Sequence, residues 1–178
     1  MNIENEITIL EINKENFINE IIKLGAKKIT EELLQKRYTY DFKPINKNKW
    51  IRLRTNGLKT TLTIKEINND SKIGAKELEI EVSSFEETNL ILNNLGYYAR
   101  NYQENKRQIF LLDDVEISID TWPMIPTYVE LEAKSINKIE NLVNKLNIDK
   151  NKITELDVTS IYKKIYNIDI LNKKVLKF

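Results

Sequence analysis

Two extended runs between residues 115 and 133 constrain the fold of this chain more than any other stretch. The runs, VEISID and YVELEA, alternate between apolar and acidic or small polar residues, which predicts two strands that each bury one face. Their polar sides carry Glu116, Ser118, Asp120, Glu130 and Glu132. If the strands pair, these carboxylates crowd together and repel one another unless cations neutralise them. The alternative is an antiparallel hairpin whose polar face is simply solvated.

The composition narrows the range of functions. The chain has 178 residues, and its 28 Lys+Arg against 27 Asp+Glu give a net charge of +1, which argues against nucleic acid or an anionic membrane as partner. Without Cys and His, disulfides, thiolate metal sites and His-dependent catalysis are excluded, so any metal must be bound by oxygen. From the first residues and the lengths of the apolar runs, we expect neither a signal peptide nor a membrane-spanning segment. We expect one cytoplasmic domain over residues 1–178, with a core of about 3–169, as a monomer or homodimer.

Alternation and capping residues predict the order of the elements. Strands are expected over residues 3–12, 26–42, 50–55, 58–67, 76–82 and 97–112 and in the two runs of 115–133. Three helices are expected to begin after the capping residues Asn13, Ser84 and Ser135. Gly25 and Gly96 are expected to end the first two helices, and Asn56-Gly57 predicts a hairpin. A last helix is expected from Asp157 to Tyr166, followed by a solvated lysine-rich tail.

The chain also repeats itself weakly at a spacing of about 71 residues. Asn13 aligns with Ser84 and Gly25 aligns with Gly96, which implies two halves that each contain a strand, a helix and a strand. About eight alternating strands, with helices at the ends of strand groups, predict an α+β fold built on an antiparallel eight-stranded closed barrel with helices packed outside. A barrel lined with charge must hold water, ions or an anionic ligand.

The polar strand faces separate into a basic group and an acidic group. The basic group is Arg37, Arg52, Arg54, Lys65 and Arg107. The acidic group is Glu4, Glu6, Glu77, Glu79, Asp120, Glu130 and Glu132. Arginines present paired donors that suit phosphate oxygens, and carboxylates suit Mg²⁺ or Mn²⁺. The alternative is a set of solvated faces with cross-strand ion pairs, but the same polar face recurs on strand after strand.

In order and spacing, these motifs resemble the CYTH or triphosphate tunnel metalloenzyme superfamily, and most closely its class IV adenylyl cyclase-like branch. The motifs are Glu4-x-Glu6, Trp50-Ile-Arg52-Leu-Arg54, Leu62-Thr-Ile-Lys65, Lys76-Glu-Leu-Glu79-Ile-Glu81-Val, Tyr102-Gln-Glu-Asn-Lys-Arg107, Glu116-Ile-Ser-Ile-Asp120-Thr-Trp122-Pro and Tyr128-Val-Glu130-Leu-Glu132. Members of this family fold as an antiparallel eight-stranded tunnel and act on triphosphates with a divalent metal.

The resemblance implies roles for individual residues. It implies metal binding by Glu4, Glu6, Asp120, Glu130 and Glu132. It implies phosphate binding by Arg52, Arg54, Lys65 and Arg107, and we expect Arg37 and Glu79 to line the same substrate site. The residues expected to take part in catalysis are Glu4, Glu6, Lys65 and Arg107. The implied cofactor is Mg²⁺ or Mn²⁺.

Two positions depart from the family pattern. The first-strand signature is Glu-x-Glu-x-Lys, and Thr8 stands where the lysine belongs. The later strand often has Lys-x-Arg, and Asn105 stands where the lysine belongs. Both changes remove a positive charge that would stabilise a phosphate in the transition state. Arg37 or Lys36 is a candidate to compensate for the missing positive charge.

Three functions follow from these expectations. The first is a metal-dependent enzyme that hydrolyses inorganic triphosphate or an organic or nucleoside triphosphate, or that cyclises ATP to cAMP. The second is a catalytically weakened module that binds a nucleotide or polyphosphate, which Thr8 and Asn105 favour. The third, RNA binding by the basic strands, is weakest because the net charge is balanced and no stacking motif is present.

Overall fold

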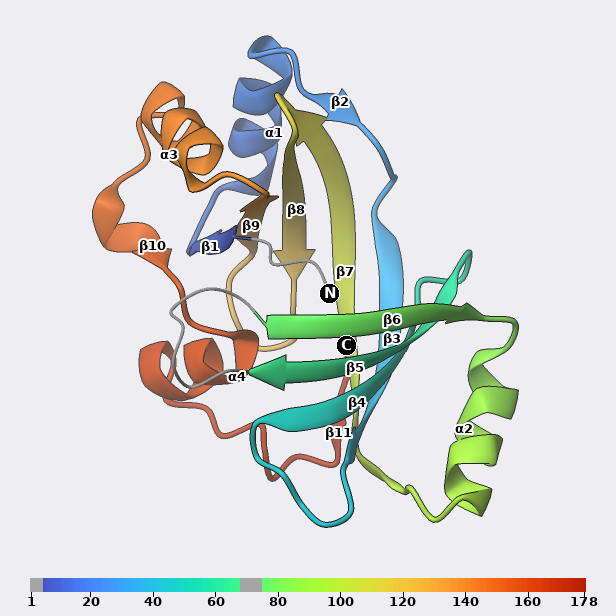
Figure 1. Ribbon diagram of the computed structural model, residues 1–178. Coiled ribbons are helices and arrows are strands. Elements are labelled where there is room, and N and C mark those ends of the chain that lie inside the picture. The colour runs from blue at the N-terminus through green and yellow to red at the C-terminus, as the bar shows by residue number, and fades with distance from the viewer. Residues whose placement is uncertain (1–4, 68–74) are drawn as a thin grey trace. The chain divides into compact units, whose positions relative to one another are not determined.

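The structure of this protein is a computed structural model that describes residues 5–67 and 75–178. The chain divides into two compact units, and Figure 1 labels their helices and strands. Unit 1 comprises residues 34–105 and 171–178, and unit 2 comprises residues 5–33 and 106–170, each within the described ranges. The long strand β7 (Ala99–Leu112) belongs to both, since its first half lies in unit 1 and its second half in unit 2.

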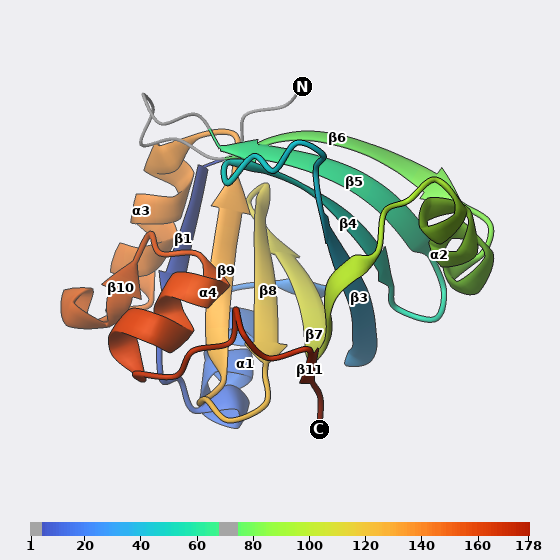
Figure 2. The same ribbon diagram turned by 90° about the horizontal axis from the view of Figure 1, so that it is seen from below.

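Unit 1 is an antiparallel sheet with one helix. Its elements are β3 (Leu33–Asp41), β4 (Lys49–Thr55), β5 (Thr60–Ile67), β6 (Ala75–Val82), α2 (Phe85–Asn94), the first half of β7 and β11 (Val175–Leu176). The strands follow the order β7-β3-β4-β5-β6, which Figure 2 shows, and β11 pairs with β7. The predicted hairpin at Asn56-Gly57 is confirmed, because β4 and β5 pair on either side of it and Gly57 has the positive φ of 84° that its turn requires.

The two faces of the unit 1 sheet differ in polarity because successive side chains of a strand alternate. One face carries Tyr40, Ile51 and Leu53, which pack with Phe85 and Leu92 of α2 into a hydrophobic core. The hydroxyl of Tyr40 also donates to Asn89 of α2 over 2.8 Å. The other face is polar and carries three of the predicted phosphate-binding residues, Arg52, Arg54 and Lys65. The helix therefore covers the apolar face and leaves the charged face uncovered within this unit.

Unit 2 is also an antiparallel sheet, with helices on one face. Its elements are β1 (Asn5–Ile9), α1 (Lys14–Lys23), β2 (Lys27–Lys28), the second half of β7, β8 (Val115–Thr121), β9 (Tyr128–Ala133), α3 (Ile136–Lys145), η1 (Lys150–Lys152), β10 (Ile153–Thr154), α4 (Val158–Ser160) and η2 (Ile161–Ile165). The strand order is β10-β1-β9-β8-β7, and β2 pairs with β7. The predicted pairing of 115–121 with 128–133 is confirmed, with Glu116 opposite Glu132 and Ser118 opposite Glu130.

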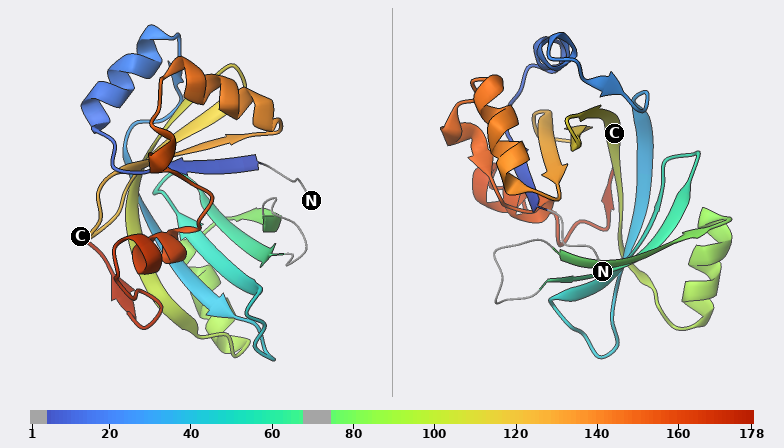
Figure 3. Two further views of the ribbon diagram at one scale, coloured as in Figure 1. Left: turned by 90° about the vertical axis from the view of Figure 1, so that its left-hand side faces the viewer. Right: turned by 45° about the horizontal axis from the view of Figure 1, so that its top comes forward.

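Helices α1 and α3 lie over the same face of β1, β8 and β9 (Figure 3). They contribute Phe17, Ile21, Ile139, Leu142 and Val143 to a core with the apolar side chains of these strands. The predicted caps hold for the first two helices, because Asn13 Oδ1 accepts from the N–H of Asn16 and Ser84 Oγ accepts from the N–H of Glu87. Ser135 stands at the start of α3 but makes no side-chain capping bond.

Three expected elements differ in the structure. The strand expected over 26–42 is split into β2 and β3, because the N–H groups of Ile29 and Thr30 both reach the carbonyl of Ile109 and so break the pairing register, as a bulge does. The expected last helix contains a π-helical stretch, η2, whose widened turn ends with the N–H of Tyr166 on the carbonyl of Ile161.

The expected solvated tail is the third correction. Val175 and Leu176 form β11 beside Tyr102 and Gln103 of β7, and Leu176 is buried. The apolar Leu176 stabilises an end that its lysines alone would leave in solvent. The large antiparallel sheet with helices is thus confirmed, whereas the strand order of the described residues ends at β10 and at β6, so closure into a barrel remains a prediction.

Candidate functional site

The polar face of unit 1 brings four of the residues predicted to line the substrate site onto neighbouring strands. Arg37 of β3 lies opposite Arg54 of β4, and Arg52 lies between Thr39 and Thr63 on the two adjacent strands. Lys65 of β5 follows on the same face, two residues beyond Thr63. The face is therefore cationic where the strand alternation predicted it.

Two glutamates of β6 hold these cations in place. Arg52 Nη2 lies 3.4 Å from both Glu77 and Glu79, and Lys65 Nζ lies 2.6 Å from Glu77. Arg54 is 3.9 Å from Glu79, which also accepts a 2.6 Å hydrogen bond from the hydroxyl of Thr63. A phosphate that binds here must therefore compete with two carboxylates for the same donors.

The ionisation of Glu79 reflects these contacts. Burial alone would raise the pKa of its carboxyl, but the Thr63 hydrogen bond and the charges of Arg54 and Arg52 outweigh burial and lower the pKa below its ordinary value. Glu79, expected as a substrate-site residue, thus lies among the cations as a negatively charged partner. Glu77 was only part of the acidic group in the sequence, and its register opposite Lys65 is the signal that identifies it.

Arg37 lies beside the position where the family lysine is missing. Its guanidinium donates to Asn105 Oδ1 and, over 3.2 Å, to Gln35 Oε1. All three side chains are buried, and Asn105 has no exposed surface. A positive charge therefore lies next to Asn105 even though residue 105 is neutral. Sequence reasoning missed Gln35, although its spacing of two from Arg37 places it on the same strand face.

In unit 2 the structure brings Arg107, Asp120 and Glu130 together. Arg107 donates from Nε and Nη2 to the two oxygens of Asp120 at 3.0 and 2.6 Å, and Nη2 also contacts Glu130. Asp120 is fully buried. Burial alone would lower the pKa of Arg107, but the charges of Asp120 and Glu130 outweigh it and raise the pKa, so the guanidinium stays charged. Its Nη1 makes no hydrogen bond within the described part of the chain.

A ladder of carboxylates runs across β1, β9 and β8. Glu6 lies opposite Glu132, and Glu132 lies opposite Glu116. These side chains offer only oxygen ligands, which suits Mg²⁺ or Mn²⁺. Between residues 5–67 and 75–178, however, no group of three acidic side chains lies close enough to hold a metal ion as it stands. The donor chemistry fits a divalent cation, and the side chains would have to converge on it.

The other predicted metal ligands have different surroundings. Asp120 and Glu130 share their carboxylates with Arg107, so a cation there would have to use their remaining lone pairs. Glu4 lies outside the described residues. Glu116 was not expected as a ligand, although it has the same alternation as Asp120 on its strand.

Thr8 occupies the position of the missing first-strand lysine. It lies opposite Glu130 of β9 and Thr154 of β10, and it is buried. Ser118 of β8 lies opposite Glu130 from the other side. The row of side chains that crosses β10, β1, β9 and β8 thus consists of the Glu130 carboxylate and three hydroxyl groups. None of these four residues is a cation.

The predicted site residues therefore form two groups, each within one unit. The cationic group of Arg37, Arg52, Arg54 and Lys65, with Glu79, lies in unit 1. The second group lies in unit 2 and comprises the carboxylates of Glu6, Asp120, Glu130 and Glu132, with Arg107.

Within the described ranges, no helix has both the length and the apolar character needed to cross a membrane.

Comparison with solved structures gives the same fold over most of the chain. The PH1012 protein from Pyrococcus horikoshii OT3 is 22% identical, with a TM-score of 0.73 over 88% of this chain and 96% of that one. A candidate adenylate cyclase from Vibrio parahaemolyticus is 14% identical, with a TM-score of 0.77 over 93% and 98% of the two chains. A candidate adenylyl cyclase from Hippeastrum, described as having a dominant triphosphatase activity, is 12% identical, with a TM-score of 0.62 over 98% and 100%.

Among curated protein sequences, none matches this chain significantly. The CYTH domain, in contrast, matches residues 2–166. This match includes both units and confirms the resemblance seen in the strand motifs. Since it extends over most of the chain, this protein belongs to the CYTH family.

Proposed function

We propose that this protein is a metal-dependent triphosphatase that hydrolyses inorganic triphosphate or the triphosphate group of a small organic molecule. The observation that carries the proposal is the cluster of Arg52, Arg54 and Lys65 on one face of the unit 1 sheet, where they pair with Glu77 and Glu79. Several cations on adjacent strands can neutralise the closely spaced charges of a polyphosphate. Members of the CYTH family act on triphosphates with divalent metals, which supports the same substrate class.

In this proposal, residues 2–166 act as a single CYTH domain whose sheet closes into a tunnel. The cations of unit 1 serve as phosphate ligands, and the carboxylates of unit 2 serve as metal ligands. Arg52, Arg54 and Lys65 bind phosphate oxygens, and Arg107 adds the N–H groups of Nη1. The carboxylates of Glu6 and Glu132, with Glu4 and the shared oxygens of Asp120 and Glu130, would hold Mg²⁺ or Mn²⁺, which when bound neutralises charge on the phosphoryl oxygens.

Hydrolysis is favoured over ATP cyclisation for two reasons. Cyclisation requires recognition of the nucleoside so that its 3′-hydroxyl reaches the phosphorus, and the clustered residues include no base-binding group. The Hippeastrum relative, although classed with cyclases, is described as mainly a triphosphatase. In hydrolysis, water forms the new P–O bond and the bridging P–O bond breaks, so that orthophosphate and a diphosphate are released and one water is consumed.

The alternative is a module that binds polyphosphate without turnover. Thr8 and Asn105 favour it, because each removes a cation, and Arg107 is already paired with two carboxylates. The two functions differ in one observable, which is product formation by a protein that binds the substrate.

The test is incubation with tripolyphosphate, ATP and other nucleoside triphosphates, with Mg²⁺ and with Mn²⁺, with orthophosphate and cAMP measured separately. We expect orthophosphate to be released and no cAMP to form. Binding of tripolyphosphate, measured by calorimetry, without any product would support the binding module. Formation of cAMP as the main product would show that the protein cyclises ATP and would contradict the proposed hydrolysis.

A further inference from the structure

Unit 1 contains a cavity on the face of its sheet opposite to Arg37. This cavity has a volume of about 630 Å³ and lies between β3, β7, β11 and the beginning of α2. Its residues Lys36 and Tyr38 alternate with Gln35 and Arg37 along β3, so they point to the other face of the strand. The volume lies within the range of roughly 300–1,000 Å³ typical of small-molecule sites. The cavity is thus separated from the polar face by the sheet itself.

Three aromatic rings form one wall of this cavity. Tyr38 stacks on Phe85 of α2, with ring centroids 5.1 Å apart and the planes tilted by 15°. Tyr38 also lies beside Tyr102 of β7, with the ring centroids 5.2 Å apart and the planes tilted by 55°. All three residues line the cavity. Such a wall offers flat apolar surface to a planar ring.

The remaining lining is strongly basic. Lys36, Lys174 and Lys177 line the cavity, and within the described part of the chain none of their ammonium groups forms an ion pair or a hydrogen bond. Arg100 also lines it and is paired with Asp41 at 2.6 Å. Glu86 is the one carboxylate among the lining residues that the structure describes. Three unneutralised lysines around one cavity repel one another, and an anion would relieve that repulsion.

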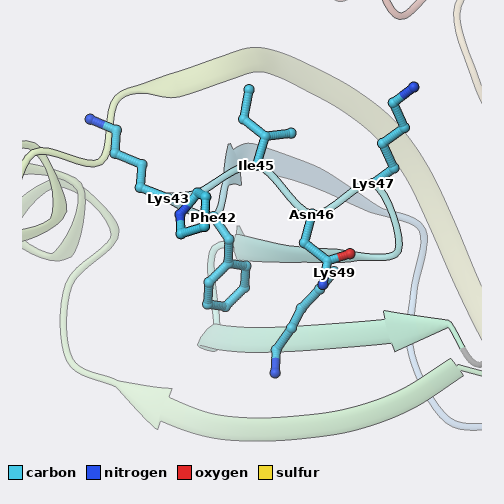
Figure 4. Close-up of a pocket in the computed structure, with 7 residues that line it drawn as sticks. Phe42, Lys43, Ile45, Asn46, Lys47 and Lys49 are labelled. Carbon is cyan, nitrogen blue, oxygen red and sulfur yellow. The ribbon is translucent and has the colours of Figure 1, made fainter.

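Another cavity of unit 1 provides a contrast (Figure 4). It has about 460 Å³ and is formed by the loop between β3 and β4, with Phe42, Lys43 and Lys49 among its residues. Lys49 is paired with Glu66 at 3.2 Å, and Lys43 donates to the carbonyl of Gly96. Two of its lysines are thus already engaged within the protein. The basic cavity beside β11 is the better anion site.

We propose that this basic cavity binds a nucleotide, with the phosphate held by Lys36, Lys174 and Lys177 and the base against the ring of Tyr38 or Tyr102. Lysine ammonium groups are general phosphate ligands, and an aromatic side chain stacks on any base. Since Lys174 and Lys177 come from the chain end that forms β11, the nucleotide would also bind this end to β7. The site does not depend on the proposed triphosphatase activity, because none of its lining residues is a phosphate or metal ligand in that proposal.

The test uses the full chain with the double substitution Arg52→Gln and Arg54→Gln, which weakens the polar-face site. Equilibrium dialysis would measure binding of AMP, pyrophosphate and adenosine, none of which is a triphosphate. We expect AMP to bind more tightly than either pyrophosphate or adenosine. Lys36→Gln and Lys174→Gln should each weaken AMP binding by about tenfold, whereas Glu86→Gln should tighten it by about threefold, since removal of a like charge favours the anion.

A separate substitution tests the contribution of the aromatic wall to nucleotide binding. Tyr102→Leu should weaken AMP by roughly tenfold and leave pyrophosphate unchanged, because only the base stacks. Melting temperatures of all variants would show that they fold. Equal affinities for AMP and pyrophosphate would overturn the nucleotide assignment. AMP binding that is lost with the Arg52 and Arg54 substitutions, or that is indifferent to Lys36→Gln and Lys174→Gln, would overturn the site.

Discussion

Arg107 donates two hydrogen bonds to Asp120, one to each carboxylate oxygen, and Asp120 has no exposed surface. The same guanidinium contacts Glu130 on the next strand. This arrangement links β7, β8 and β9 through one cation. It also means that a residue expected to bind phosphate and two expected to bind metal already neutralise one another in the protein without ligand.

Loss of the Asp120 charge should destabilise the fold. Removing one partner of a buried pair costs ~3–5 kcal/mol, and because Glu130 still contacts Arg107, we expect Asp120→Asn to lower the free energy of unfolding by about 3 kcal/mol. Urea unfolding followed by circular dichroism measures it. The control is Glu81→Gln, which breaks an exposed pair with Lys59 and should change stability by less than about 1 kcal/mol. Equal effects of the two substitutions would show that the Arg107–Asp120 pair has no special structural role.

Stability at acidic pH should depend on Glu79. The pKa of its carboxyl is below the ordinary 4.5, so the ionised form is favoured by the fold. A lowered pKa stabilises the protein above the unfolded-state value, and this contribution disappears as the pH falls through the folded-state value. Between pH 4.5 and the folded-state value, the wild type should therefore lose stability more steeply than Glu79→Gln.

Urea midpoints measured at a series of acidic pH values would check this dependence. Glu20→Gln is the control, because the exposed Glu20 of α1 forms no side-chain hydrogen bond or ion pair within the described residues. It should keep the wild-type slope. A Glu79→Gln protein with the same slope as the wild type would contradict the role of the Thr63, Arg52 and Arg54 contacts.

The chain end should contribute to stability through Leu176. This side chain is 3% exposed, whereas Val175 in the same strand is 54% exposed. Large-to-small changes in a core cost ~2–5 kcal/mol, so Leu176→Ala should lower the free energy of unfolding by about 2 kcal/mol. Val175→Ala should cost much less. If the two substitutions are equivalent in urea unfolding, the end is not packed on β7 as described.

Substitution of Thr8 should show how much the missing cation at this position limits catalysis. Thr8 faces Glu130 across the strand pair, so a lysine there would place its charge beside that carboxylate. We expect Thr8→Lys to raise kcat with tripolyphosphate relative to Thr8→Met, which has similar bulk and no charge. Steady-state kinetics with Mg²⁺ would measure both variants, with melting temperatures to verify folding. A kcat that is equal in the two variants would show that the cation at this position is dispensable.

Sequence patterns predicted most of the fold because its determinants are local. Alternation placed the strands, Asn13 and Ser84 marked helix starts, and Asn56-Gly57 marked a hairpin. The broken strand at Ile29 and Thr30 depends on a distant carbonyl of Ile109, and β11 depends on burial of Leu176. Neither interaction leaves a local signal.

The candidate site was predicted in composition but only partly in its contacts. Strand alternation identified the faces of Arg52, Lys65 and Asp120. It could not show that Glu77 and Glu79 would pair with the cations, or that Arg107 would pair with Asp120, because such pairs follow from strand order and register. The charges that make these residues suitable for ligands also make them partners for one another.

The central claim, that this protein is a metal-dependent triphosphatase, is tested most directly by orthophosphate release from tripolyphosphate. Arg52→Gln of unit 1 and Glu6→Gln of unit 2 would be compared with the surface control Lys138→Gln on α3. We predict that the wild type and Lys138→Gln release orthophosphate at similar rates, and that Arg52→Gln and Glu6→Gln each lower kcat/KM by about 100-fold or more. If either Arg52→Gln or Glu6→Gln releases orthophosphate at the wild-type rate, the result would contradict this proposal.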